Sequence, residues 1–318
     1  MNTQNRLMKK KFTQIPDFLI IGAGKSGTTS LDNYLKQHPE IFISERKEPN
    51  FYGYELNQLS DFSVKSEINH YTDSVTNLED YLNLFSSAGQ QQLKGETSNT
   101  YMYHNTAAER IQHYNPEMKL IAILRQPAER LYSRFLHLAR ENELPTDNFL
   151  DCLDKESIWW WRNDLVKEGF YGQYLKKYYE LFDHSQIKVF LFEDLKNHPE
   201  KLFKEVFQFL NIDSGFEPNL SVEYNQSGFI KNKKVDAIFG GKGIINRTMK
   251  FILPKKIISS LKGNIQVQKK IQSLRSKNLH KPKLKTELKQ QITNEIYLED
   301  IKELQKLIDR DLSHWHSS

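Results

Sequence analysis

A short apolar run that ends in a glycine-rich turn constrains this chain more than any other feature. Residues Phe18–Ile21 are apolar, and the turn Gly22–Ser30, which reads GAGKSGTTS, follows directly. The run predicts a buried strand, and the hydroxyl residues Thr28–Ser30 predict a helix that begins behind the turn. Glycines let the backbone turn tightly with its N–H groups pointing inward, so this arrangement predicts an anion-binding site. Lys25 adds a positive charge within the turn.

Three kinds of anion-binding loop compete for this turn. Gly22, Gly24 and Gly27 satisfy the dinucleotide pattern G-x-G-x-x-G, and Glu45 lies near the distance expected for a ribose-binding acid. A Walker P-loop needs a glycine where the chain has Leu19, so that pattern fails. The third kind is a P-loop-like turn for a phosphosulfate, in which a lysine precedes a Gly-Thr-Thr run. A dinucleotide loop has little use for that lysine and those threonines, so the third interpretation is favoured and the first is the alternative.

Strand-like and helix-like segments alternate along the rest of the chain. Strands are predicted at Ile41–Ile43, at Leu93–Glu96 on a sheet edge, at Leu120–Leu124 and at Ile187–Phe192, and helices at Thr28–Gln37, Ala128–Arg140, Gly169–Phe182 and Pro199–Leu210. The stretch Leu56–Asn77 is polar and is expected to be irregular. Alternation predicts a single α/β domain over residues 15–318, with a central parallel sheet flanked by helices and a flexible segment at 1–14. Ligands of such sheets bind at the carboxyl ends of the strands.

The composition excludes several classes of protein. Of the 318 residues, 38% are hydrophobic and 27% are charged, which is typical of a folded soluble domain. No apolar run approaches the ~20 residues that span a bilayer. The first residues, Met1–Gln14, are charged without an apolar stretch behind them, so we expect no secretory signal and a cytoplasmic protein. Cys152 is the single cysteine and the histidines lack paired spacing, so no metal site is expected.

Positive charge is concentrated in one segment. The net charge is +5, yet residues 231–290 hold 17 Lys and Arg against 2 acidic residues, a balance of 17 − 2 = +15. A basic, helical segment at about 240–290 predicts an anionic partner, either a membrane surface or a polyanionic acceptor, and no nucleic acid is expected. A solvated lysine-rich surface explains the same pattern equally well. A polyanion-binding protein without catalysis is therefore a second alternative.

Several segments share patterns with one known family. They are Pro16–Leu31, Lys47–Tyr52, Leu124–Pro127 with the helix behind it, Gly169–Tyr171 and Phe192–Leu195. Together they resemble the sulfotransferase superfamily that uses 3′-phosphoadenosine 5′-phosphosulfate (PAPS). The closest resemblance is to the branch of heparan sulfate sulfotransferases and their bacterial relatives. It implies transfer of a sulfuryl group to a hydroxyl, or alternatively an amine, of a carbohydrate, glycolipid or small metabolite.

The resemblance also implies roles for individual residues. Lys25 would stabilise the leaving phosphate, and Glu48 would act as the general base toward the acceptor. The donor would be bound by Ser26, Gly27, Thr28, Thr29 and Ser30 at its 5′-phosphate, by Arg125 and Ser133 at its 3′-phosphate, and by Lys231, Lys233 and Lys234 in a late loop. The acceptor would contact Glu96, His137, Trp160 and Tyr171.

The environment of Glu48 can be anticipated from its neighbours. The residue before a proline favours an extended backbone, so Pro49 predicts that conformation for Glu48. Phe51 and Tyr52 can shield the carboxylate from water, which would raise its pKa toward that of a useful base. An exposed loop acid is the alternative.

At some positions the sequence departs from the family pattern or allows two roles, so the identity of the acceptor and the residues that bind it are not fixed. Asn50 stands where the family motif has a histidine, and Thr97 stands where glycosaminoglycan enzymes often have a lysine. The resemblance therefore supports the donor chemistry more strongly than a heparan-type acceptor. Glu96 is either a substrate contact or a buried acid paired with a lysine or arginine. The run Trp159–Trp161 is either a sugar-stacking platform or a packing cluster.

Overall fold

The computed structural model describes residues 15–221, 229–230, 279–280 and 282–316. The predicted flexible segment 1–14 and most of the basic segment at about 240–290 lie outside these residues, as do Lys231, Lys233 and Lys234. Predictions for those positions therefore stay predictions.

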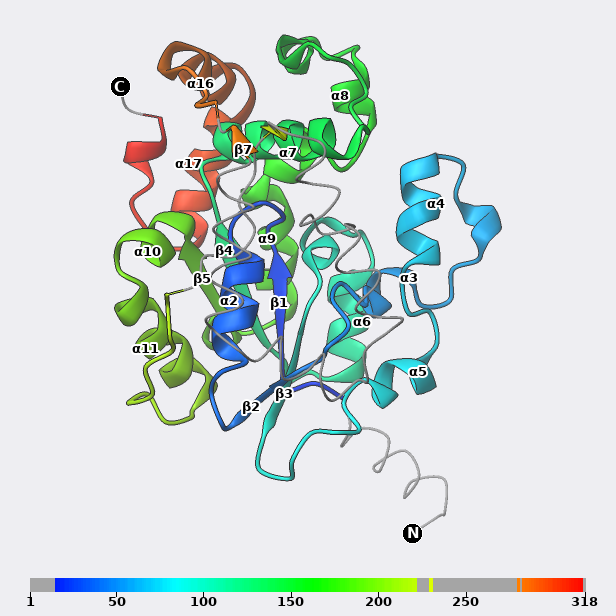
Figure 1. The fold of residues 1–318 in the computed structure, drawn as a ribbon, viewed down its shortest axis with the longest axis vertical. Coiled ribbons are helices and arrows are strands. Elements are labelled where there is room, and N and C mark those ends of the chain that lie inside the picture. The colour runs from blue at the N-terminus through cyan, green and yellow to red at the C-terminus, as the bar shows by residue number, and fades with distance from the viewer. Residues whose placement is uncertain (1–14, 222–228, 231–278, 281, 317–318) are drawn as a thin grey trace.

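The described chain is built on five parallel strands. They are β1 (Phe18–Gly22), β2 (Ile41–Ile43), β3 (Leu93–Thr97), β4 (Lys119–Leu124) and β5 (Ile187–Leu191), in the order β2-β3-β1-β4-β5. Figure 1 shows β1 at the centre of the sheet with helices around it. This confirms the predicted α/β fold with a central parallel sheet flanked by helices.

The third strand is not an edge strand, so that prediction is wrong. β3 pairs with β2 on one side and with β1 on the other. Its residues look polar in sequence, but Thr97 donates to the Asp32 carboxylate at 2.8 Å and Glu96 accepts hydrogen bonds from hydroxyl groups. Gly95 has no room for a side chain, because a Cβ there would lie 2.2 Å from the Phe18 ring. Satisfied polar groups and one glycine therefore allow this segment to be an interior strand.

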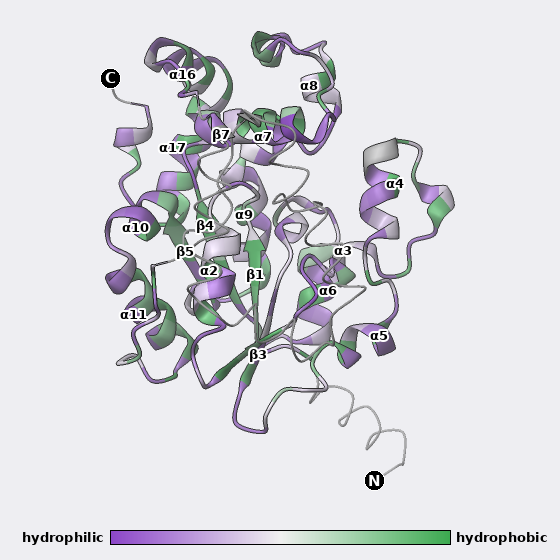
Figure 2. Ribbon diagram, viewed as in Figure 1, coloured by the Kyte–Doolittle hydropathy of each residue, from purple (hydrophilic) through white to green (hydrophobic). Residues whose placement is uncertain are grey.

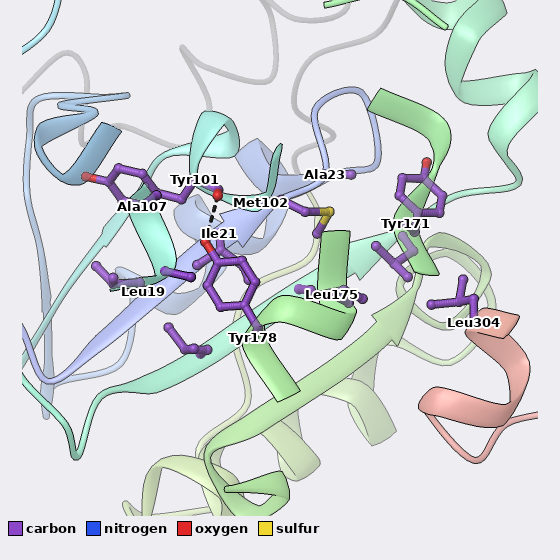
Figure 3. Close-up of a cluster of buried hydrophobic side chains, with 14 of the residues drawn as sticks. Leu19, Ile21, Ala23, Tyr101, Met102, Ala107, Tyr171, Leu175, Tyr178 and Leu304 are labelled. Atoms are coloured by element: carbon purple, nitrogen blue, oxygen red, sulfur yellow. Dashed lines mark hydrogen bonds between the residues drawn. The ribbon is translucent and has the colours of Figure 1, made fainter. Parts of the chain in front are cut away.

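Strand alternation divides the core into two layers. Leu19 and Ile21 of β1 pack on one face of the sheet, and Phe18 and Ile20 pack on the other. The first face is covered by α6 (Ala107–Tyr114), α7 (Pro127–Glu141), α9 (Tyr171–Leu181) and α17 (Leu298–Leu307), and the second by α2 (Thr28–Leu35) and α11 (Pro199–Leu210). Figure 2 shows hydrophobic strands between helices of mixed polarity. Figure 3 shows the first layer, where the Tyr178 hydroxyl donates to the Tyr101 carbonyl at 2.6 Å.

Shorter elements complete the described fold. They are α3 (Phe51–Tyr54), α4 (Lys65–Thr72), α5 (Leu78–Asn83), α8 (Ile158–Trp161), α10 (Phe192–Asn197), α16 (Thr286–Ile292) and the antiparallel pair β6 (Phe229–Ile230) and β7 (Leu279–His280). The helix α4 corrects the expectation that Leu56–Asn77 is irregular. Only Ile68 and Tyr71 are apolar within it, too few to produce a periodic stripe. Of the helices described, none has the length and apolar character needed to cross a membrane.

The C-terminal helix α17 caps the N-terminus of α9. The Asp300 carboxylate accepts hydrogen bonds from the backbone N–H groups of Gly172 and Gln173, both at 2.9 Å. We expect Asp300→Ala to lower the free energy of unfolding by about 1–2 kcal/mol, because it removes a helix cap. Urea denaturation measures this. Glu299→Ala is the control, since among the described residues Glu299 makes just one exposed ion pair, with Lys302. An equal loss from both variants would contradict the capping role.

Candidate active site

The glycine turn after β1 forms one wall of the site. Gly27 adopts φ +99°, and a Cβ there would lie 3.1 Å from both Phe192 and Leu195, so glycine is required at the start of α2. The backbone N–H groups of Lys25, Gly27 and Thr28 form no hydrogen bond with another described residue. Such a row of unpaired N–H groups at a helix N-terminus can bind an anion, as the sequence predicts.

Lys25 projects into a cationic environment. Burial and, after it, the positive charges of Arg134, Arg140 and Arg125 lower the pKa of its ammonium to about 7, while the charge of Glu168 acts in the opposite direction. Within the described residues the ammonium has no hydrogen-bond or ion-pair partner. An anion bound against the turn would relieve this repulsion and restore the charge of Lys25.

Arg125 follows β4 at the same edge of the sheet. Its guanidinium lies 3.0 Å from the Glu129 carboxylate and 4.9 Å from the centre of the Phe192 ring. The hydroxyl of the buried Tyr171 donates to the Arg125 carbonyl at 3.0 Å, so Tyr171 braces the strand end. Ser133 is also buried, two turns along α7.

The sheet order separates Glu45 from the turn. In dinucleotide-binding folds the second strand lies next to the first, and its acid reaches the ribose. Here β3 lies between β1 and β2, and Glu45 is an exposed residue beyond the outer strand. The ribose-binding role considered for Glu45 therefore does not fit this topology.

Glu48 is held between two loops. Its carboxylate accepts hydrogen bonds from the backbone N–H of Asn99 at 2.9 Å and from the Asn99 side-chain Nδ2 at 2.6 Å. Burial raises the pKa of Glu48 to about 7, while the hydrogen bond from the Asn99 backbone N–H and the charge of Lys47 act in the opposite direction. The raised pKa agrees with the burial expected from the sequence, and the Phe51 and Tyr52 rings pack against Tyr81.

The backbone of Glu48 does not agree with the sequence. Its φ is +50°, in the left-handed region rather than the extended one expected before Pro49. Its N–H donates to the Thr97 carbonyl at 3.1 Å, and the Asn50 N–H donates to the Ser98 hydroxyl at 3.0 Å. Pairing with the loop after β3 thus imposes a conformation that local preference disfavours.

Other predicted residues occupy different places. Glu96 is completely buried and accepts hydrogen bonds from Tyr81 at 3.1 Å and Ser98 at 2.8 Å, and burial raises its pKa to about 7. Its partners are hydroxyl groups, so the alternative in which Glu96 pairs with a lysine or arginine is wrong, although the acid is buried. Because the side chain is enclosed, Glu96 does not face solvent at the sheet edge.

His137 interacts electrostatically with Lys25, whereas no interaction between Trp160 and Lys25 is described. His137 lies on α7, 3.1 Å from the Arg140 guanidinium, and burial together with the charge of Lys25 lowers its pKa to about 3. The imidazole of His137 is therefore neutral, and it lies near enough to Lys25 to be affected by its charge. Trp160 is half-buried and donates to the Cys152 carbonyl at 2.9 Å, and the centre of its ring lies 6.1 Å from that of Phe170, so it packs against both segments.

Arg130 and Arg134 of α7 were not predicted as site residues from the sequence. Arg130 is fully buried and lies 2.5 Å from Glu168, and Arg134 forms an ion pair with Asp164. With His137, these arginines recur every three or four residues, which places them on one helix face. This spacing is the sequence pattern from which a cationic helix face could have been predicted.

In the described part of the chain, no three His, Cys, Asp or Glu residues are grouped to hold a metal ion.

The fold and site define an α/β protein in which a glycine turn, several positively charged side chains and a carboxylate of raised pKa lie near the carboxyl ends of parallel strands. The chain belongs to the sulfotransferase family, whose model matches residues 16–218. It is 28% identical over 252 residues to human carbohydrate sulfotransferase 15, covering 62% of this chain and 44% of that protein. It is also 26% identical over 234 residues to mouse bifunctional heparan sulfate N-deacetylase/N-sulfotransferase 4, covering 70% of this chain and 25% of that protein.

The comparisons confirm the resemblance recognised from the sequence. A crystal structure of a sulfotransferase from Alicyclobacillus acidocaldarius superposes with a TM-score of 0.69 at 24% identity, covering 95% of this chain and 99% of that one. This likeness confirms the fold. The family match favours the sulfotransferase interpretation of the turn over the dinucleotide-binding one. The chain spans less than half the length of the two curated relatives named above.

Proposed function

We propose that this protein transfers the sulfuryl group of PAPS to a hydroxyl, or alternatively an amine, of a carbohydrate, glycolipid or small metabolite. One observation carries the proposal. The Lys25 ammonium forms no hydrogen bond or ion pair with a described residue, and the loop bearing it passes near Asn99, which holds the base-like Glu48. Displacement at sulfur needs a cation that stabilises the leaving phosphate and a base that removes the proton of the acceptor.

Each residue has a role in the proposed reaction. The backbone N–H groups of Lys25, Gly27 and Thr28 would bind the 5′-phosphate, together with the side chains of Ser26, Thr29 and Ser30. Arg125 and Ser133 would bind the 3′-phosphate. These contacts would hold the donor in line with the acceptor.

The chemical step exchanges one sulfur–oxygen bond for another. The acceptor oxygen forms a bond to sulfur while the bond from sulfur to the phosphate oxygen breaks. The proton of the acceptor passes to Glu48, and the electron pair leaves with the phosphate beside Lys25. A carboxylate whose pKa is about 7 combines sufficient basicity with a populated ionised form near neutral pH.

A carbohydrate acceptor is supported by the names of the relatives, one a carbohydrate sulfotransferase and one a heparan sulfate N-sulfotransferase. Thr97 stands where glycosaminoglycan enzymes often have a lysine. It is buried and its hydroxyl donates to Asp32, so this position offers no positive charge to a glycosaminoglycan. Contact of the basic segment with an anionic membrane or polyanionic acceptor stays a prediction, as does the cytoplasmic location.

Nucleotide binding tests the donor directly. Ligand binding raises apparent stability by mass action, so a thermal-shift comparison of 3′,5′-ADP, 5′-AMP, NAD and ATP separates the candidates. We expect the largest rise in Tm with 3′,5′-ADP, because it alone combines the two phosphates at the positions that the site would bind. Stabilisation by NAD and none by 3′,5′-ADP would contradict the proposal and favour the dinucleotide alternative. Binding of polyanions with no sulfate transfer would favour the non-catalytic alternative.

The two groups of pKa about 7 predict a narrow pH profile. Glu48 must lose its proton and Lys25 must keep its own, so kcat/KM measured at low donor should fall on both sides of about pH 7. Bound donor places negative charge beside Lys25 and raises its pKa, so the basic limb of the kcat profile should move to higher pH while the acidic limb stays. A kcat/KM that is flat between about pH 5 and about pH 9 would contradict this assignment.

A further inference from the structure

Asn99 contacts both oxygens of the Glu48 carboxylate. Its backbone N–H donates to Oε2 at 2.9 Å, and its side-chain Nδ2 donates to Oε1 at 2.6 Å. Two donors from one residue define the plane of the carboxylate as well as its position. Asn99 begins the short 3-10 turn Asn99–Tyr103 directly behind β3, so it is attached to the interior of the sheet.

The backbones of the two loops are joined by other bonds. The Glu48 N–H reaches the Thr97 carbonyl, the Asn50 N–H reaches the Ser98 hydroxyl, and the Thr100 hydroxyl donates to the Asn50 side chain at 2.7 Å. These bonds remain if the Asn99 side chain is removed. The contribution of the Asn99 amide is therefore the direction and ionisation of the Glu48 carboxylate rather than the path of the loop.

Asn99 also lies close to the glycine turn. A Cβ at Gly24 would lie 3.9 Å from the Asn99 Cβ, and Gly24 immediately precedes Lys25. The Oδ1 atom of Asn99 is buried and receives no hydrogen bond from the described residues. Asn99 thus lies between the turn that would hold the donor and the carboxylate that would accept the proton, with one acceptor atom still unused.

We propose that Asn99 is a positioning residue that holds the general base Glu48 against the glycine turn, in the orientation and ionisation state that proton transfer requires. This inference rests on the proposed function, in which Glu48 is the base. A hydrogen bond to the ionised form of a carboxylate lowers its pKa, so Asn99 keeps Glu48 ionised against the effect of burial.

The test is the pH profile of Asn99→Ala. Hydrogen bonds to charged groups are strong, so we expect kcat near neutral pH to fall by roughly 10- to 100-fold. Affinity for 3′,5′-ADP should be unchanged. The acidic limb of the profile should move to higher pH, so that part of the lost rate returns in alkaline buffer. Asn99→Asp should lose more, because it removes the amide donor and adds a like charge beside Glu48.

Two controls separate positioning from a general loss of structure. Asn33→Ala removes an asparagine that donates to the Thr29 carbonyl in the first turn of α2 and makes no hydrogen bond to Glu48 in the described structure, so it should leave the acidic limb in place. In a Glu48→Gln background, Asn99→Ala should cause no further loss. An equal loss in both backgrounds, or a loss with an unmoved acidic limb, would overturn the positioning role.

The inference and the proposed function fail in different ways. Full transfer by Glu48→Gln alone would overturn the assignment of the base and hence the proposed mechanism. A strongly impaired Glu48→Gln together with a parent-like Asn99→Ala would overturn only the inference about Asn99. Circular dichroism and the urea midpoint of each variant establish that the compared proteins are folded.

Discussion

Glu48→Gln is expected to reduce sulfuryl transfer by roughly 10²-fold or more, because general base catalysis contributes about that much to the rate. The substitution keeps the size of the side chain and one oxygen for hydrogen bonding with Asn99, but it removes the basic site. Donor binding depends on the glycine turn and on Arg125, so affinity for 3′,5′-ADP should stay nearly unchanged. Single-turnover transfer from PAPS and calorimetric titration of 3′,5′-ADP measure the two quantities.

Glu45→Gln is the matched control for this prediction. Glu45 is an acid three positions earlier in the same loop, and it is exposed to solvent. Its substitution should affect transfer much less. An inactive Glu45→Gln, or a Glu48→Gln that transfers sulfate at the parent rate, would show that the motif has been assigned in the wrong register.

Lys25→Ala should give the second large effect, and it should act mainly on the rate. Negative charge grows on the leaving phosphate oxygen in the transition state, so loss of the ammonium should lower kcat by roughly 10²- to 10³-fold, as for other groups that stabilise developing charge. Arg125→Ala should act mainly on donor affinity, because the 3′-phosphate is remote from the breaking bond. The two variants should therefore differ in how the loss divides between kcat and the KM for PAPS.

The exposed Lys176 on α9 offers a control for the loss of one positive charge. Lys176→Ala should change neither constant. Full transfer by Lys25→Ala would contradict its assignment, and an Arg125→Ala variant with parent affinity for 3′,5′-ADP would show that another residue binds the remote phosphate.

The strand–turn–helix at residues 18–35 could be predicted because its determinants are local. Apolar residues, glycines and hydroxyl residues follow one another at the spacing that a strand, a tight turn and a helix N-terminus require. The same holds for Arg125 at the end of an apolar strand and for α7 behind it. Alternation of strands and helices predicted the parallel sheet, and therefore the edge at which these residues meet.

Strand order could not be read from local patterns. Residues Leu93–Glu96 look like an edge strand because they include a lysine and a glutamate, whereas strand pairing on both sides and the close approach of Gly95 to Phe18 place them inside the sheet. That placement separates β2 from β1 and brings the loop after β3 against Glu48. The backbone conformation of Glu48 is a consequence of this pairing and overrides the preference set by Pro49.

The sequence alone determined the class of fold and predicted an anion-binding turn, since both depend on neighbours within a few positions, and its resemblance to the family implied Lys25, Arg125 and Glu48 as candidate site residues. Only the tertiary structure decided that Asn99 holds Glu48, that Glu96 is enclosed, and that Arg134 and Arg140 lower the pKa of Lys25. Asn99 and Glu48 are 51 residues apart, and burial and electrostatic interaction depend on which distant segments meet in space. Local periodicity carries no information about such long-range contacts.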